Sequence, residues 1–172
     1  MQNSTKQTSF PLLGASTALT VTNLQSLASS ATAGWQSDRI SNLVTRAEDY
    51  LVGIKMTTAN TAPANDKAMY VWICPFYTTD NGSTWYAASQ GTATLPTGTQ
   101  GTTTITQPND LLIGKVLAYT TQQQIVQTSF LLSSVFGRNM PQGFSIIITN
   151  FSGAALSTGC FVELTPMNQQ IM

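Results

Sequence analysis

Residues 50–57 read YLVGIKMT, and this stretch decides the fold class. Its apolar residues Tyr50, Val52, Ile54 and Met56 occupy every second position, which is the pattern of a β-strand with one buried face. Residues 69–74 read MYVWIC and are apolar at every position instead. We expect that strand to be central, with one face on the core and the other against a neighbouring segment or subunit.

Working outward, seven segments have strand-like composition and are bounded by turn residues: 18–24, 48–57, 68–77, 111–120, 124–132, 143–151 and 159–165. Many short strands with such spacing predict an all-β protein built as an antiparallel β-sandwich. The run Asp80-Asn81-Gly82 is a strong turn signal. Two short helical turns are predicted, at residues 37–44 and 131–136.

The chain divides into an arm and one domain. Its 172 residues and 42% hydrophobic content suffice for a single core, which we assign to residues 17–172. Residues 1–16 have few periodic apolar positions, so we expect an extended N-terminal arm. Its apolar anchor, which we predict to bind a partner, is Phe10, Pro11, Leu12 and Leu13. Residues 87–109 predict either a long surface loop or a weak edge strand with a loop.

Charge is scarce in this chain. Charged residues make up 8% and the formal net charge is zero, so little repulsion separates copies, which suits a protein that works in an assembly. We expect no membrane span and no signal peptide, hence assembly in a cytoplasm. Cys74 and Cys160 lie in apolar segments and are expected as reduced, buried thiols, although a bridge between them stays open.

The sequence offers little catalytic chemistry. The absence of His excludes Ser-His-Asp and Cys-His arrangements and the commonest zinc ligand. Glu48 and Asp49 are adjacent and would point to opposite sides of a strand, which makes them a poor acid–base pair. No phosphate-binding loop is present. We therefore predict that the protein is not an enzyme and uses no cofactor or metal.

We expect no direct contact with nucleic acid, because the arm contains a single basic residue, Lys6, to neutralise phosphates. Among the aromatic residues, Trp72 is assigned to the core. Trp85 and Tyr86 follow the Asp80-Asn81-Gly82 turn and are the aromatics expected near a surface. They could form a stacking platform for a sugar, or they could simply pack the end of a hairpin.

Several stretches together resemble small jelly-roll cement or decoration proteins of tailed-bacteriophage capsids. They are residues 19–28, 50–56, 69–73 and 130–151. The resemblance implies a jelly roll of about eight strands, which is what this many short segments would build. It also implies a homotrimer on the outer surface of the virion capsid, assembled in the host cytoplasm, that cements neighbouring major capsid protein subunits. Residues 87–109 depart from the family pattern.

The sequence leaves three other functions open. The first is a carbohydrate- or receptor-binding module of a phage head fibre or tail, which would use Trp85 and Tyr86 with the 87–109 segment. The second is the principal coat protein of a small icosahedral virus, which the short neutral arm disfavours. The third, an enzyme, lacks any catalytic constellation.

Overall fold

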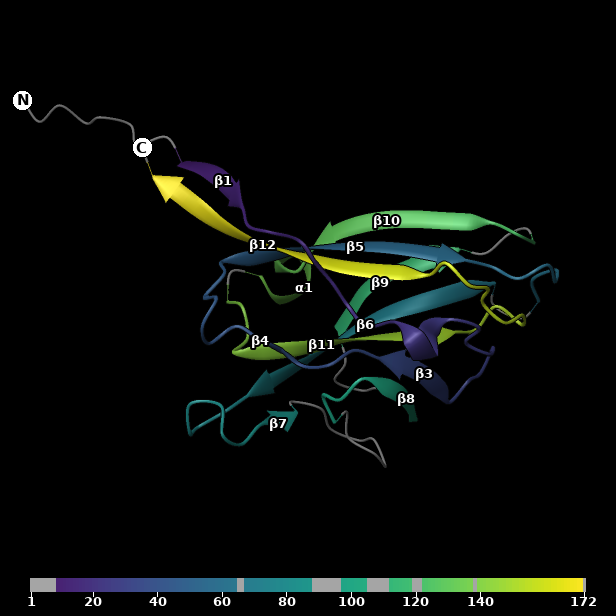
Figure 1. Cartoon of the computed structure of the whole chain (residues 1–172), viewed down its shortest axis with the longest axis horizontal. Helices are drawn as coiled ribbons and strands as arrows, with labels where there is room; N and C mark the ends of the chain where they lie inside the picture. Colours follow the sequence, from purple (N-terminus) through teal and green to yellow (C-terminus); the bar gives the residue numbers. More distant parts are fainter. Residues whose placement is uncertain are drawn as a thin grey trace, which may run out of the picture.

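The computed structural model describes residues 9–64, 67–87, 97–104, 112–118, 122–137 and 139–171, and these form two antiparallel sheets packed face to face (Figure 1). The first sheet has the order β1-β12-β5-β10, with β2 also paired to β12. Its strands are β1 (Ser9–Leu13), β2 (Thr17–Ala18), β5 (Asp49–Thr57), β10 (Ile125–Leu131) and β12 (Phe161–Ile171). The predicted all-β sandwich is therefore confirmed.

The second sheet has the order β7-β6-β11-β3-β8, with β4 beside β11 and β9 beside β6. Its strands are β3 (Ala33–Gln36), β4 (Ile40–Ser41), β6 (Ala68–Tyr77), β7 (Tyr86–Ala87), β8 (Gly101–Thr104), β9 (Leu112–Ala118) and β11 (Gly143–Asn150). A 3₁₀ turn, η1 (Thr22–Leu24), and a short helix, α1 (Ser133–Phe136), complete the described elements. The predicted helical turn at 131–136 is confirmed.

Two sequence predictions are wrong. Residues 18–24 were expected as a strand, but the chain leaves β2 after Ala18 and forms η1, which turns Leu24 into the core as the chain crosses between sheets. Residues 37–44 were expected to be helical. They contain β4 instead, because Ser37 donates its N–H to the Ile146 carbonyl (2.8 Å) and accepts from the Ile146 N–H (3.0 Å), which ties this segment to β11.

The core lies between the two sheets. Alternate residues of β5, namely Tyr50, Val52, Ile54 and Met56, are buried there as their spacing predicts. β11 is buried along its whole length because it lies between β6 on one side and β3 and β4 on the other. Removing these apolar side chains from water is the main force that holds the sandwich together.

A second apolar cluster lies on the outer face of the second sheet. Cys74, Phe76 and Ile147 are buried there, and Trp72 and Trp85 pack against them. A Cβ on Gly98 would come within 3.2 Å of the Phe76 ring, so the segment containing Gly98 covers this cluster. The prediction that residues 69–74 contact a neighbouring segment through their second face is thus confirmed, with Trp72 in this outer cluster.

Other expectations concern the thiols and the segment 87–109. Cys74 and Cys160 are both buried and unbridged, as predicted. Within 87–109, the described residues Gly101–Thr104 form β8, an edge strand paired with β3. The rest of that segment, apart from Ala87 and residues 97–100, lies outside the described residues.

Candidate functional site

A two-stranded ribbon projects from the body of the sandwich (Figure 1). Over the first part of β12, from Phe161 to Met167, the strand pairs with β5. Its last part, from Met167 to Ile171, pairs with β1 from Leu13 back to Ser9. The ribbon therefore continues beyond the end of β5, and it includes the residues predicted as the apolar anchor of the arm.

The base of the ribbon is fixed to the domain. Gly14 donates its N–H to the Pro166 carbonyl (2.8 Å), and a hydrogen bond of 2.6 Å joins the hydroxyls of Ser16 and Thr165. A Cβ on Gly14 would lie 2.8 Å from Cγ of Pro166, so only glycine allows the two chains to approach this closely. The described part of the predicted 1–16 arm, residues 9–16, is thus held against β12.

The apolar anchor is open to solvent where its side chains are described. Leu12 and Leu13 are 52% and 57% exposed, and Pro11 is also exposed. Phe10 takes part in β1 opposite Gln170, but its side chain lies outside the described residues. Leu12 and Leu13 are adjacent on a strand and so face opposite sides of the ribbon. Both faces of the ribbon therefore present apolar surface.

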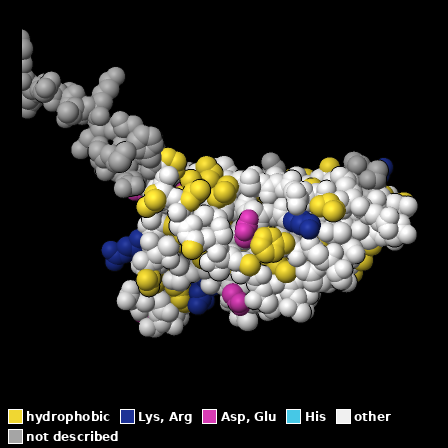
Figure 2. Space-filling view, turned by 45° about the horizontal axis from the view of Figure 1, so that its top comes forward, with side chains coloured by type: hydrophobic (Ala, Val, Ile, Leu, Met, Phe, Trp, Pro, Cys, Tyr) yellow, Lys and Arg dark blue, Asp and Glu magenta, His cyan; other side chains and the backbone are white. Residues whose placement is uncertain are grey.

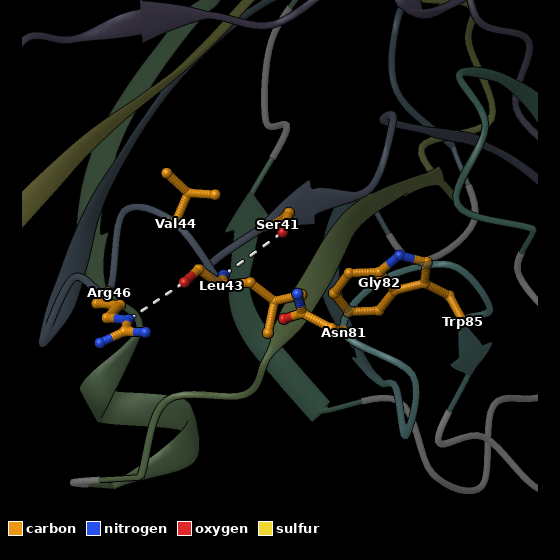
Figure 3. Close-up of a pocket in the computed structure, with 7 residues that line it drawn as sticks. All are labelled: Ser41, Leu43, Val44, Arg46, Asn81, Gly82 and Trp85. Carbon is orange, nitrogen blue, oxygen red and sulfur yellow. Dashed lines mark hydrogen bonds between the residues drawn. The ribbon is translucent and has the colours of Figure 1, made fainter.

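A second candidate surface is a solvent-open depression at one end of the sandwich, with a volume of about 570 Å³ (Figure 3). It lies between the loop that follows β4 and the turn that follows β6. The residues that line it are Ser41, Leu43, Val44, Arg46, Asn81, Gly82 and Trp85. Val44 stands at the tip of its loop and is 92% exposed.

The loop after β4 is held by Asn42. Its Oδ1 accepts hydrogen bonds from the Ala47 N–H (2.8 Å) and from the Tyr50 hydroxyl (2.9 Å), while its Nδ2 donates to the Ala47 carbonyl (3.1 Å). Arg46 has a φ of 45° and donates from Nε to the Leu43 carbonyl (3.3 Å). One wall of the depression is therefore held by side-chain hydrogen bonds.

The opposite wall is the predicted turn. Asn81 and Gly82 have positive φ values of 55° and 94°. The Asp80 carboxylate accepts from the Thr84 N–H (2.8 Å) and the Thr78 hydroxyl (2.7 Å). Hydrogen bonds with Thr84 and then Thr78 lower the pKa of Asp80 to about 2, so the carboxylate that organises this turn is ionised at neutral pH.

Trp85 has neighbours that limit its use as a platform. The Arg39 guanidinium lies over the indole, 4.6 Å from the ring centroid. A Cβ on Gly143 would lie 2.8 Å from Cζ3 of the indole, so the ring rests on the backbone of β11. Trp85 thus packs the end of the sandwich and adds only part of its surface to the depression.

Tyr86 faces a different direction from Trp85. It lies opposite Tyr77 in the β6–β7 pairing, and their rings stack with centroids 5.3 Å apart and planes at 24°. Both tyrosines are exposed. The structure therefore separates the two predicted recognition residues into an indole packed under Arg39 and an open tyrosine pair. Arg39 and Leu43 were not identified from the sequence.

The adjacent carboxylates Glu48 and Asp49 show no arrangement for acid–base chemistry. Asp49 accepts hydrogen bonds through Oδ1 from the N–H groups of Tyr50 (2.7 Å) and Ser133 (2.9 Å), so it helps to fix the start of α1. Glu48 is exposed. Within the described residues no three His, Cys, Asp or Glu side chains lie close enough together to hold a metal ion.

No helix in the described part of the chain is long and apolar enough to cross a membrane. No protein-family model, curated protein or solved structure matches the chain.

Proposed function

We propose that this chain is a non-enzymatic structural protein of a bacteriophage particle, which binds the outer surface of the capsid and cements neighbouring major capsid protein subunits. The residue patterns that resemble capsid decoration proteins suggest this role. The observation that carries it is the projecting β1–β12 ribbon with its exposed Leu12 and Leu13.

The ribbon has the physical properties of a docking element. An isolated two-stranded ribbon is at best marginally stable in water, so it gains order when it packs on another surface. Full burial of an exposed leucine contributes roughly 1.5–3 kcal/mol, and Leu12 and Leu13 are already about half covered, so each has about 1 kcal/mol to gain. Such modest contacts cement a shell when many copies bind simultaneously.

The strand pairing supports the jelly-roll assignment. Eight strands, taken in chain order, pair from the two ends inward. These pairs are β2 with β12, β3 with β11, β5 with β10 and β6 with β9. This nested pairing is what a long antiparallel hairpin gives when it is rolled into two facing sheets. Jelly rolls are common in viral capsid proteins and also in lectins, so the fold alone does not select the role.

The surface composition also supports a role within an assembly. The face seen in Figure 2 carries only a few charged side chains, together with patches of hydrophobic side chains, and the rest of it is backbone and uncharged side chains. An uncharged surface of this kind can form hydrogen bonds across an interface without burying unpaired charges. We expect the partners to be the major capsid protein and further copies of the chain, in a trimer by the resemblance, with no direct contact to nucleic acid.

The test is co-sedimentation with capsids that lack this protein, followed by measurement of capsid melting. Binding and a raised melting temperature support cementing. Leu12→Asp and Leu13→Asp should each weaken binding and, compared with one another, report which face of the ribbon docks. Val116→Asp is the matched control because Val116 is similarly exposed (49%) on β9. The proposal would be refuted if the folded protein did not bind capsids, or if all three variants changed capsid binding equally.

A second candidate function is a carbohydrate- or receptor-binding module. The depression beside Trp85 and the exposed Tyr77–Tyr86 pair favour it, because polar groups next to aromatic faces suit sugars. A glycan array with the unmodified chain and Tyr86→Ser tests this function. Specific glycan binding that Tyr86→Ser abolishes, from a protein that does not bind capsids, would replace the first proposal with the second.

A further inference from the structure

We infer that β10 is a self-association strand: two copies of the chain pair through their β10 strands, antiparallel, about a two-fold axis at Thr128. The first sheets of the two copies then form one continuous sheet across the axis. This inference does not depend on the proposed capsid role, and it follows from four features of β10.

The first feature is an unprotected edge. Among the described residues β10 pairs with β5 alone, and Figure 1 shows it at the border of the first sheet. Exposed edges normally carry charged residues, Pro or bulges that prevent pairing with another chain. The strand reads IVQTSFL and has neither a charged residue nor a Pro, and its register with β5 is unbroken.

The second feature is the direction of the backbone groups. Leu132 donates its N–H to the Tyr50 carbonyl (3.0 Å), and Thr58 donates to the Gln124 carbonyl (3.0 Å), both in the β5–β10 register. Even-numbered residues of β10 therefore direct their N–H and C=O groups toward β5. The odd-numbered residues Ile125, Gln127, Ser129 and Leu131 direct theirs away from it.

The third feature is a sequence that is its own complement. With Thr128 on the axis, Ile125 of one copy lies opposite Leu131 of the other, and Val126 lies opposite Phe130. Gln127 lies opposite Ser129, so apolar residues meet apolar residues and polar residues meet polar ones. β-Branched, aromatic and Thr–Thr cross-strand pairs of this kind stabilise sheets.

Backbone direction and side-chain complementarity select the same register. The opposed residues 125 and 131, and 127 and 129, are all odd-numbered and direct their backbone groups at the partner, so each pair can exchange two hydrogen bonds. Thr128 then faces its symmetry mate in a non-hydrogen-bonded pair. Because the strand carries no charge, a second copy meets no repulsion there.

The fourth feature is incompletely buried apolar surface on both faces of β10. On the outer face Ile125 is 58% and Leu131 is 38% exposed. On the inner face Val126 and Phe130 pack against the core but are only partly buried. A strand added at this edge covers both faces at once, and this distinguishes it from a partner that docks on one face. An isologous contact of this type builds a dimer and cannot by itself build a trimer.

The first test is the mass of the full chain in solution by light scattering. We expect an even number of 18.4 kDa chains, two where β10 is the sole self-contact and six where the trimer implied by the resemblance also forms. Ser129→Pro removes an N–H that points away from β5, which an edge strand tolerates, and should halve the mass with an unchanged circular dichroism spectrum. An unmodified chain that is monomeric or trimeric, or an oligomer whose mass Ser129→Pro leaves unchanged, would overturn the inference.

The second test fixes the register and does not need the Pro variant to fold. Thr128→Cys places two thiols on the axis with Cα atoms about 4.5 Å apart, within disulfide range. In Ser129→Cys, the control, the two Cα atoms are separated by more than about 7 Å. We expect oxidation to cross-link Thr128→Cys and not Ser129→Cys, while Cys74 and Cys160 stay buried. The reverse result, or no cross-link in either, would refute the pairing.

Discussion

Gly143→Ala tests whether Trp85 serves mainly to pack the end of the sandwich. A Cβ at residue 143 would lie 2.8 Å from Cζ3 of Trp85 and 3.1 Å from the carbonyl oxygen of Ile40. Neither neighbour can move freely, because Ile40 belongs to β4 and Arg39 covers the indole. Overpacking of this kind costs about 1–3 kcal/mol, offset by the 0.5–1 kcal/mol that Ala gains over Gly in a strand. We expect a net loss of about 1–2 kcal/mol.

Gly53→Ala is the matched control. A Cβ at residue 53 would come equally close, 2.9 Å, to Cγ and Oε1 of Glu163. That neighbour is a flexible side chain on the exposed face of the sheet, so it can swing away. The stability should therefore change by no more than about 0.5 kcal/mol. If the two added Cβ atoms come equally close to a neighbour but cost different amounts of stability, the mobility of that neighbour decides the effect, and the distance does not.

Urea unfolding at a fixed protein concentration measures these differences and keeps any self-association constant. A double-mutant cycle with Trp85→Ala then isolates the indole. In that background Gly143→Ala should lose at least half of its cost, with the remainder due to the Ile40 carbonyl. If Gly143→Ala lowered the free energy of unfolding equally with and without the indole, the reasoning would be refuted, and Trp85 would be available for a role in binding.

Two further predictions concern buried groups. Asn150→Ala should destabilise the fold by about 2–4 kcal/mol, because the buried Asn150 side chain donates hydrogen bonds to the carbonyls of Leu27 (3.0 Å) and Ala154 (2.8 Å). Asn23→Ala, at an exposed residue, is the control in the same urea assay. Equally small effects of the two variants would contradict this prediction. Burial raises the pKa of the Cys74 thiol from 9.0 to about 12, so the unfolded chain releases its proton first. The free energy of unfolding should therefore fall as pH rises from 9 toward 12, by up to about 1.4 kcal/mol per pH unit for this thiol. Cys74→Ala should flatten the curve of urea midpoint against pH. A slope that Cys74→Ala leaves unchanged would show that other groups cause the pH dependence.

Periodic apolar residues predicted the strands that form the core. The expected 68–77 segment is β6 (Ala68–Tyr77), and 48–57 differs from β5 (Asp49–Thr57) by one residue. Both strands owe their structure to burial, which alternation reports directly. β8 reads GTTT and was not assigned as a definite strand, because it has no apolar pattern and owes its structure to pairing with β3.

The end of β12 was missed for a related reason. The sequence prediction stopped at Thr165, before a Pro, a Met and three polar residues, yet the strand continues to Ile171. Its continuation pairs with β1, more than 150 residues earlier in the chain, as the register of Leu13 with Met167 illustrates. A local pattern carries no information about such a partner. The prediction of an apolar anchor at Leu12 and Leu13 still located the exposed residues of this ribbon.

The candidate recognition pair shows that neighbours in the sequence need not share a surface. Trp85 and Tyr86 are neighbours in the sequence, which suggested a shared platform. Successive residues of an extended chain point to opposite faces, so one packs beneath Arg39 while the other stacks on Tyr77. The alternation rule was available from the sequence and argues against a shared platform. The cation above the indole, by contrast, comes from a residue 46 positions earlier and required the fold.

The two proposed contacts are compatible because they use opposite borders of one sheet. In the order β1-β12-β5-β10, the ribbon belongs to one end and the self-association strand to the other. Pairing through β10 therefore leaves both ribbons uncovered and holds them at the two far ends of a continuous sheet. In the proposed capsid role, two linked ribbons can engage two capsid sites at once, which can strengthen binding by a factor of about 10²–10⁴ without any new contact. On this reasoning, pairing at the β10 edge should add to the binding strength that the modest apolar gain at each ribbon provides.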